Sequence, residues 1–246
     1  MGQKIVELKM PTNYSDAELR SRIANKFRIK NFSFQIENKS LDARNKSDIH
    51  WLLKVFIQSE EIKELVPVTN ETLSVPYKKR NEKVVVVGSG PAGFFSAYIL
   101  QKAGFKVVLI ERGSEVEHRG QMIEKFERTE EFDSNNNYAY GEGGAGTFSD
   151  GKLTSRSKHI SIEKGFIINE YVDAGAPQEI KYLAHPHLGS DNLKLIVKNL
   201  REKFVKIGGK IVFNTCVTDL KIKKKKIYSV ETSTGENYET DYLIMA

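Results

Sequence analysis

Residues 83–113, KVVVVGSGPAGFFSAYILQKAGFKVVLIERG, constrain the fold more than any other stretch of the chain. The valine run at 84–87 has the composition of a parallel strand that is buried on both faces. The turn GSGPAG follows at once, and Pro91 suits the first turn of a helix that Gly104 would end. FKVVLIE then reads as a second buried strand, with Glu111 at its end, 23 residues after the first glycine of the turn. The pattern predicts a strand, a tight turn, a helix and a parallel neighbouring strand.

Each position of this motif has a use in a dinucleotide-binding fold. Gly88 permits the tight turn, Gly90 lets main chain approach a pyrophosphate, and Gly93 lets the helix pack closely on the sheet. The phosphates would lie over the helix N-terminus, and Glu111 would accept hydrogen bonds from the adenosine ribose. The alternative is a glycine-rich turn in an unrelated α/β domain. The residues that we expect to bind the cofactor through this motif are Gly88, Ser89, Gly90, Pro91, Ala92, Gly93, Glu111 and Arg112.

The composition is that of a soluble globular protein, with 39% apolar and 28% charged residues in 246. No apolar run approaches the length of a membrane span, and the N-terminus lacks the apolar core of a signal peptide, so we expect a cytoplasmic protein without membrane contact. Cys216 is the single cysteine, which excludes an internal disulfide, a CxxC dithiol and a thiolate metal cluster within these residues. Any redox chemistry must come from a bound cofactor.

Residues 1–66 have a pattern of their own, which predicts a small α+β domain. KIVELKM, FSFQIENKSLDA and DIHWLLKVFIQS read as strands, and the last of these alternates so that one face is wholly apolar. SDAELRSRIANKFRI reads as a helix capped by Ser15 or Asp16, and EEIKELV as a short closing helix. Residues 67–82 have linker composition. We therefore expect a domain at 1–66, a linker at 67–82 and a Rossmann-like domain at 83–246.

The positive charge is concentrated near the N-terminus, where residues 1–80 carry 15 Lys and Arg against 10 Asp and Glu. A modest excess of this kind is typical of a solvated surface. A contact with nucleic acid is the alternative. Phe32, Phe34 and Trp51 could stack on bases, but they lie in apolar alternations that favour a core position. We do not expect nucleic acid to be a partner.

A long excursion follows Glu111, where an ordinary NAD domain would continue its alternation of strands and helices. It contains a polar helical segment at 115–132, then the glycine-rich stretch GEGGAGTFSDGKL at 141–153, then more helix. Clustered glycines indicate main chain that must approach another group closely. Flavoprotein folds make such excursions, and their returning loops lie along FAD. A glycine-rich surface loop is the alternative.

The sequence resembles the FAD-dependent dehydrogenase-like proteins of bacteria, a branch of the flavoproteins with two dinucleotide-binding domains. The resemblance rests on Ser134-Asn135, GEGGAGTFSDGKL, DAGAP at 173–177, HPHLGSDNL at 185–193, NLREKFVKIGGKIVFNT and SLDARNK at 40–46. The family's spacing between the Ser-Asn pair and the first glycine is shorter than in this sequence. The resemblance implies FAD as cofactor, with further contacts from Gly143, Gly144, Ala145, Gly146, Thr147, Ser149, Asp150, Lys152 and the backbone near Val217. It also implies that Lys152 would stabilise the anionic reduced flavin.

The remaining segments fit the same architecture. SDNLKLIVKNLREKFVKIGG predicts an amphipathic helix, KIVFNTCVTDL a strand that leads into a meander, and KIKKKK a hairpin tip. We interpret that tip as a solvated turn, with an electrostatic docking patch as the alternative. Cys216 reads as a half-buried strand residue rather than a nucleophile. His185 and His187 read as loop residues or as an acid or base near the flavin, and we expect no metal site because they have no partner at ligand spacing.

These features predict an FAD-binding oxidoreductase that acts on an unknown small-molecule substrate, with NAD(P)H as a candidate electron donor. An RNA-modifying flavoprotein and a non-catalytic nucleotide-binding module are the alternatives. In the resembling family the strand YLIMA would run on into a glycine-containing turn that closes over FAD. We therefore expect the FAD-binding domain to be incomplete at Ala246.

Overall fold

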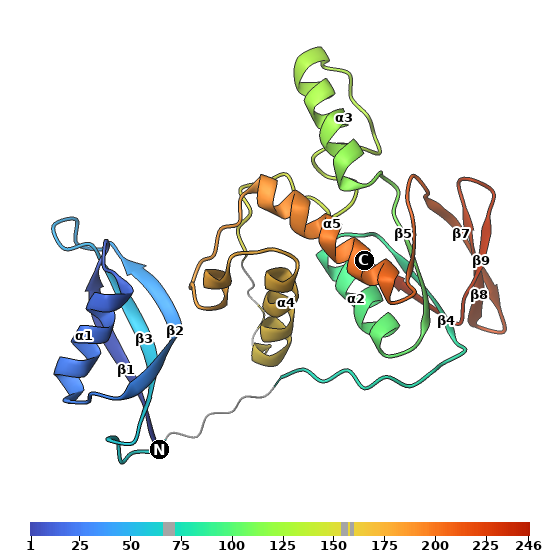
Figure 1. The fold of residues 1–246 in the computed structure, drawn as a ribbon. Coiled ribbons are helices and arrows are strands. Elements are labelled where there is room, and N and C mark those ends of the chain that lie inside the picture. Colours follow the sequence, from blue (N-terminus) through green and yellow to red (C-terminus); the bar gives the residue numbers. More distant parts are fainter. Residues whose placement is uncertain (66–71, 154–156, 158–159) are drawn as a thin grey trace. The chain divides into compact units, whose positions relative to one another are not determined.

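A computed structural model describes residues 1–65, 72–153, 157 and 160–246 of this chain. These residues form two compact units (Figure 1). The first unit comprises residues 1–65 together with 178–186. The second comprises residues 72–153, 157, 160–177 and 187–246. The domain boundary expected at 67–82 stays a prediction, and residues 67–71 lie outside the described part of the chain.

The first unit is an antiparallel sheet of three strands in the order β1-β3-β2, with a helix packed on one face (Figure 1). The helix begins with a capping box: the Ser15 hydroxyl accepts from the Glu18 amide, and the Glu18 carboxylate accepts from the Ser15 amide. Of the two expected caps, Ser15 is the one used. The elements are β1 (Gly2–Pro11), α1 (Asp16–Phe27), β2 (Phe32–Asp42) and β3 (His50–Ser59).

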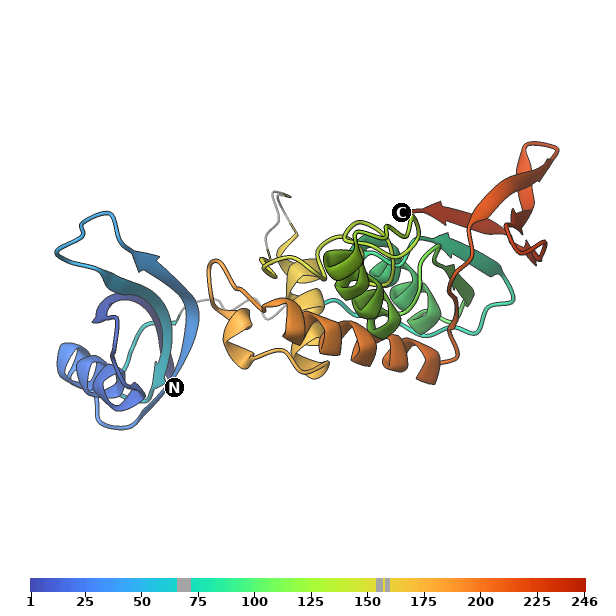
Figure 2. The same cartoon turned by 90° about the horizontal axis from the view of Figure 1, so that it is seen from above.

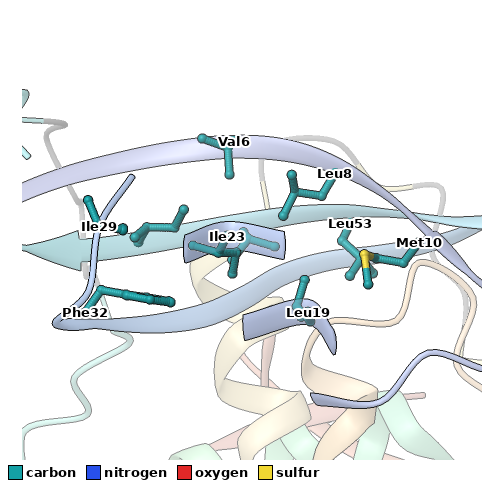
Figure 3. Packing of buried hydrophobic residues seen from close by; sticks show 10 residues of the cluster. Val6, Leu8, Met10, Leu19, Ile23, Ile29, Phe32 and Leu53 are labelled. Carbon is teal, nitrogen blue, oxygen red and sulfur yellow. The ribbon is translucent and has the colours of Figure 1, made fainter. Parts of the chain in front are cut away.

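The core of this unit lies between the sheet and α1 (Figure 3). Alternate residues of β3 are buried, and so are alternate residues of β1, as the period-two pattern predicts. Leu19 and Ile23, four residues apart on α1, are fully buried against them. Burial of each large aliphatic side chain contributes about 1.5–3 kcal/mol, so this cluster is the main source of stability for a small unit.

The predicted short helix at 60–66 is wrong for residues 60–65, which form a turn and an extended segment. Tertiary contacts explain the difference. The Glu61 carboxylate accepts from the Lys30 and Asn31 amides, and the Glu64 carbonyl accepts from the Gln3 amide. These bonds need an extended backbone beside β1, and they outweigh the weak helix propensity of a single turn.

A bulge in β2 between Ile36 and Asn38 changes which residues face α1. It brings Lys39 opposite Leu53 on the apolar face, where the Lys39 ammonium lies over the rings of Trp51 at 4.5 Å and Tyr14 at 4.9 Å. The backbone of the same lysine pairs with residues 182–184 as a one-residue parallel bridge. This strand addition is how residues 178–186, which include the 3-10 turn η1 (Gln178–Lys181), join the first unit.

The second unit is built on a parallel sheet of four strands in the order β10-β4-β5-β6. A second sheet, the antiparallel meander β7-β8-β9, packs on one face of it through Val230, Val85 and Ile110. The fold is therefore the predicted α/β Rossmann-like arrangement, preceded by a small α+β unit. Its elements are β4 (Lys83–Val87), α2 (Pro91–Lys102), β5 (Lys106–Ile110), α3 (Val116–Thr129), α4 (Ser161–Asp173), α5 (Ser190–Lys206), β6 (Lys210–Val212), β7 (Val217–Lys223), β8 (Lys226–Thr232), β9 (Asn237–Glu239) and β10 (Tyr242–Met245).

Helices α2, α4 and α5 are joined by a buried carboxylate. Glu170 of α4 accepts hydrogen bonds from the Tyr98 hydroxyl at 3.1 Å, Lys102 Nζ at 3.2 Å and Lys203 Nζ at 2.5 Å. The lysine partners hold the pKa of Glu170 below its ordinary value against the opposing effect of burial. Because one carboxylate satisfies donors from two other helices, it fixes how the three pack.

The predicted single strand KIVFNTCVTDL is wrong, because the segment is divided between two sheets. Lys210–Val212 pairs with β5, and Val217–Lys223 begins the meander. Between them Asn214 adopts a positive φ of 53°, and its amide donates to the Gly113 carbonyl. The predicted hairpin tip within KIKKKK is confirmed, since β7 and β8 are joined by Lys224 and Lys225.

The segment before β4 yields a first prediction. The amides of Lys78 and Arg80 donate to the carbonyls of Ala103 and Gly104, whereas Tyr77 is exposed. We expect a protease of broad specificity to cut within residues 72–77 before it cuts any bond of β3, because cleavage needs backbone that can leave its hydrogen bonds. Mass spectrometry of the first fragments is the measurement. Initial cleavage within His50–Ser59 would contradict the predicted boundary.

Candidate functional site

Two glycine turns that are far apart in the sequence meet in the second unit. The Gly143 amide donates to the Ser89 carbonyl at 3.1 Å, which fixes the glycine-rich loop against the turn between β4 and α2. Gly144 has a φ of +71°, and a Cβ atom on it would lie 3.0 Å from the Cα of Gly90. A side chain at Gly144 would therefore separate the two turns.

A cleft of about 520 Å³ opens beside this junction. That volume lies within the range typical of small-molecule and cofactor sites. Its lining includes six of the residues that the sequence analysis assigned to cofactor binding, together with residues that it did not. The lining residues are Val87, Gly88, Gly90, Glu111, Arg112, Ala139, Tyr140, Gly141, Gly144, Thr215, Cys216, Val217 and Ala246.

The N-terminus of α2 lies at the cleft, because its N-cap residue Gly90 is part of the lining. Glycine has no side chain that could cap the helix, and Pro91 occupies the first helical turn. The first amides of a helix have no partner within the helix, so they and the helix dipole favour an anion at this position. Gly90 leaves the approach open, because the nearest group to a Cβ built on it is Gly144 at 3.8 Å.

Glu111 forms one wall, directly after β5. Its carboxylate is buried and accepts from the Ser89 amide and the Ser89 hydroxyl, both at 2.8 Å, and from the Gly113 amide at 2.9 Å. These bonds orient the carboxylate and tie the β4–α2 turn to the end of β5. An ionised carboxylate has about four acceptor sites, so it can still accept from a ligand hydroxyl.

Arg112 and Tyr140 form the adjoining wall. The Arg112 guanidinium lies over the Tyr140 ring at 4.4 Å from its centre, and both residues line the cleft. Tyr140 comes from the stretch 136–140, where this sequence departs from the spacing of the family that it resembles. The lining of the cleft therefore includes a cation–aromatic pair.

Arg119 of α3 holds the glycine-rich loop from behind. It is fully buried, and its guanidinium donates to backbone carbonyls of five residues, at 2.7–3.2 Å. The acceptors are Asn137, Tyr138, Gly141, Glu142 and Gly144. Burial lowers the pKa of Arg119 to about 10, so the guanidinium stays charged at neutral pH. Its donors form one rigid fork, which suits a loop whose carbonyls converge, and Nη1 alone is shared among three of them.

Glu142 links the same loop to two helices. Its carboxylate accepts from the Val116 amide at 2.7 Å, which caps α3, and from Arg201 of α5 at 3.1 Å. Arg201 also pairs with Glu115 and Glu117. Burial raises the pKa of Glu142 to about 7, although Arg201 acts in the opposite direction.

Several expected site residues lie outside the lining of this cleft. Lys152 pairs with Asp150 at 2.8 Å, and both side chains are more than half exposed. His187 is exposed and its backbone pairs with Lys152, and His185, also exposed, belongs to the first unit. Thr147 is buried, with its amide bonded to the Gly144 carbonyl, and Ser149 donates to the Gly146 carbonyl. The roles assigned to these residues toward a flavin stay predictions.

The sequence analysis missed Tyr140, Thr215, Arg119 and Glu142. Arg119 and Glu142 carry charges that are typical of surface residues, and only the buried position of each reveals its role. A signal did exist for Glu142, because it stands within the glycine-rich stretch. Thr215 follows the break between β6 and β7 that the single-strand interpretation overlooked.

Arg119→Met should destabilise the second unit by roughly 3 kcal/mol or more, because five carbonyls lose a charged donor inside the protein. Arg128→Met, at an exposed position of the same helix, is the matched control. Urea unfolding followed by circular dichroism reports mainly the helices of the second unit. Trp51 fluorescence reports the first unit, since it is the single tryptophan. Equal losses in the two variants would contradict the role given to Arg119.

The raised pKa of Glu142 predicts a pH effect. A carboxyl that is ordinary when unfolded, at 4.5, and titrates near 7 when folded binds more protons in the folded state between these values. The stability that the protonated Glu142 gives to the folded state is therefore fully present below pH 4.5 and is lost as the pH rises through 7. The free energy of unfolding should fall between pH 5 and pH 8, and Glu142→Gln should make this fall smaller by on the order of 2 kcal/mol. Thermal unfolding at both pH values measures the difference, with Glu124→Gln as the control. If Glu142→Gln has the same pH dependence of stability as the unchanged protein, the raised pKa of Glu142 is contradicted.

A family model and two relatives match this chain in sequence. A family model described as pyridine nucleotide-disulphide oxidoreductase matches residues 82–246. An uncharacterised protein of Clostridium beijerinckii is 37% identical over 228 residues, which cover 86% of this chain and 41% of that protein. A thiamine thiazole synthase of Saccharolobus islandicus is 42% identical over 55 residues, 22% of this chain and 21% of the synthase. The chain thus spans less than half the length of these relatives.

Two solved structures are similar in part. A ferredoxin reductase of Rhodopseudomonas palustris has 12% identity and a TM-score of 0.33, over 67% of this chain and 23% of its own. An FAD-dependent pyridine nucleotide-disulphide oxidoreductase of Desulfovibrio vulgaris has 14% identity and a TM-score of 0.34, over 67% of this chain and 24% of its own. The family model covers well over half of the residues, and on that match the chain belongs to the pyridine nucleotide-disulphide oxidoreductase family.

Proposed function

We propose that this chain is the FAD-binding part of an oxidoreductase of the dehydrogenase-like branch that its sequence resembles. The observation that carries the proposal is the cleft in which the two glycine turns meet over the uncapped N-terminus of α2, with Glu111 at one wall. The chain belongs to the pyridine nucleotide-disulphide oxidoreductase family, and the proteins that its sequence resembles use FAD. NAD(P)H as the electron donor and a small-molecule substrate are parts of the same proposal for the whole protein.

The residues present fit the adenosine diphosphate half of FAD. The α2 N-terminus would take the pyrophosphate, and Gly90 leaves room for it. The Glu111 carboxylate would accept from the ribose hydroxyls, and the Arg112–Tyr140 pair would lie beside the adenine, with Val217 as a further contact from the same lining. When bound, FAD would supply an isoalloxazine ring that accepts a hydride or two electrons.

This chain would contribute binding and orientation rather than a redox pair of its own. It has one cysteine, Cys216, so a dithiol that exchanges with a disulfide does not lie within these 246 residues. Cys216 is half-buried, and its backbone is bonded to Ser233. We therefore assign it to the cleft wall and not to chemistry.

A pair of glycine variants tests the proposal. Gly90→Val should weaken FAD binding by roughly two orders of magnitude or more while the protein stays folded, because its side chain would enter the cleft and not the packed interior. Gly93→Ala should instead disrupt the fold, because its Cβ would lie 1.9 Å from the Gly88 carbonyl oxygen. FAD titration by flavin fluorescence and thermal unfolding measure the two effects.

Gly165→Ala is the matched control, since a Cβ at this position of α4 meets nothing within 4 Å. ADP should compete with FAD, because both would use the same cleft. Unchanged FAD affinity in a folded Gly90→Val protein would contradict the proposed site. Binding of FAD by the whole protein without reduction of the flavin by NADH or NADPH would favour a non-catalytic nucleotide-binding module.

A further inference from the structure

The hairpin of β7 and β8 ends in four consecutive exposed lysines, Lys223 to Lys226. Lys224 and Lys225 form the two-residue loop, and Lys223 pairs directly with Lys226 across the ladder. The hairpin extends away from the helices of its unit (Figure 2). Four ammonium groups are thus gathered at one end of the second unit.

The conformation of this tip is unfavourable for its own sequence. Lys224 and Lys225 have φ values of +49° and +63°, the left-handed pair of a type I′ turn. Such turns strongly favour Asn-Gly, because L residues with longer side chains are strained there. Like charges directly opposite on two strands add repulsion. The local sequence is therefore not optimised for the turn. This indicates that the lysines serve binding rather than folding.

The base of the hairpin is neutralised, in contrast to its tip. Lys221 pairs with Asp219 at 2.8 Å and with Glu231 at 2.7 Å on the same face. No such acidic partner of Lys223–Lys226 occurs among the described residues. The excess positive charge is therefore confined to the tip.

Exposed apolar side chains adjoin the lysines. Ile222 is 62% exposed, Tyr228 is 52% exposed, and Leu220 is 39% exposed. Ile222 and Leu220 continue the face that carries the buried Val230, so an apolar strip runs from the core toward the charged tip. The surface therefore combines apolar, aromatic and cationic groups within a few residues.

We propose that this tip docks on an anionic lipid surface. Lysines attract acidic headgroups, and Tyr together with an aliphatic side chain is suited to the boundary between headgroups and acyl chains. Nucleic acid would use the lysines but would leave Ile222 exposed. An acidic protein would favour arginine, whose fork binds carboxylates in pairs, whereas the tip contains lysine alone.

The proposed contact is peripheral, and it departs from our expectation of a protein without membrane contact, which rested on the sequence's lack of a spanning segment and of a signal peptide. No helix within the described residues is long and apolar enough to cross a membrane. A single lysine near an anionic surface contributes roughly fivefold to binding, so a few lysines and one inserted aliphatic residue give weak binding that salt reverses.

The test uses the whole chain with the double variant Lys224→Asn/Lys225→Gly. This variant creates the favoured turn, so it should keep or raise the melting temperature while it removes two charges. Co-sedimentation with phosphatidylcholine vesicles that contain about one third phosphatidylglycerol should fall roughly 25-fold. Lys46→Asn/Lys63→Asn removes the same charge from exposed positions of the first unit and should change binding little.

A second variant, Ile222→Ser, distinguishes lipid from other polyanions. It should weaken binding to anionic vesicles and leave binding to a single-stranded oligonucleotide unchanged. Pure phosphatidylcholine vesicles should not bind the chain. The proposal is overturned if the two double variants lose vesicle binding equally, if Ile222→Ser has no effect, or if the chain binds the oligonucleotide and not the vesicles.

Discussion

The candidate site depends on one buried cation. Arg119 gathers carbonyls from two stretches of the excursion, the turn at 137–138 and the glycine-rich loop at 141–144. A loop of this composition has little side-chain packing to define its path, so its backbone must be held by hydrogen bonds. Arg119 is buried, so the loss of any of these hydrogen bonds would leave a polar group without a partner inside the protein and would lower the stability of the fold. The position of Gly144 against Gly90 follows from this arrangement.

Two buried carboxylates tie the site to the elements around it. Glu142 joins the loop to the α3 N-terminus and to Arg201 of α5, while Glu111 joins the β4–α2 turn to the end of β5. Each carboxylate is buried and each has backbone donors, which makes it tolerable in the interior. The cleft is thus enclosed by elements whose mutual positions are set by polar contacts, which suits a site for a polar, anionic cofactor.

Some local predictions from the sequence failed because tertiary hydrogen bonds overrode local preference. EEIKELV has the composition of a helix, but its carboxylates and carbonyls are used by Lys30, Asn31 and Gln3. KIVFNTCVTDL has a continuous strand pattern, but Asn214 turns the chain so that its two halves pair in different sheets. The pattern of apolar residues along a strand indicates which of its side chains are buried, but it does not indicate the sheet in which the strand pairs.

The sequence by itself determined the Rossmann-like core and one half of the candidate site. Buried parallel strands, a glycine turn and a terminal acidic residue are local signals, because each depends on neighbours within about 30 residues. Tertiary structure alone decided the rest: the meeting of Gly144 with Gly90, the wall made by Tyr140 and Thr215, and the burial of Arg119 and Glu142. A charged residue has the same local pattern on a surface and in an interior, so only the assembled fold shows which charges are enclosed and what they hold.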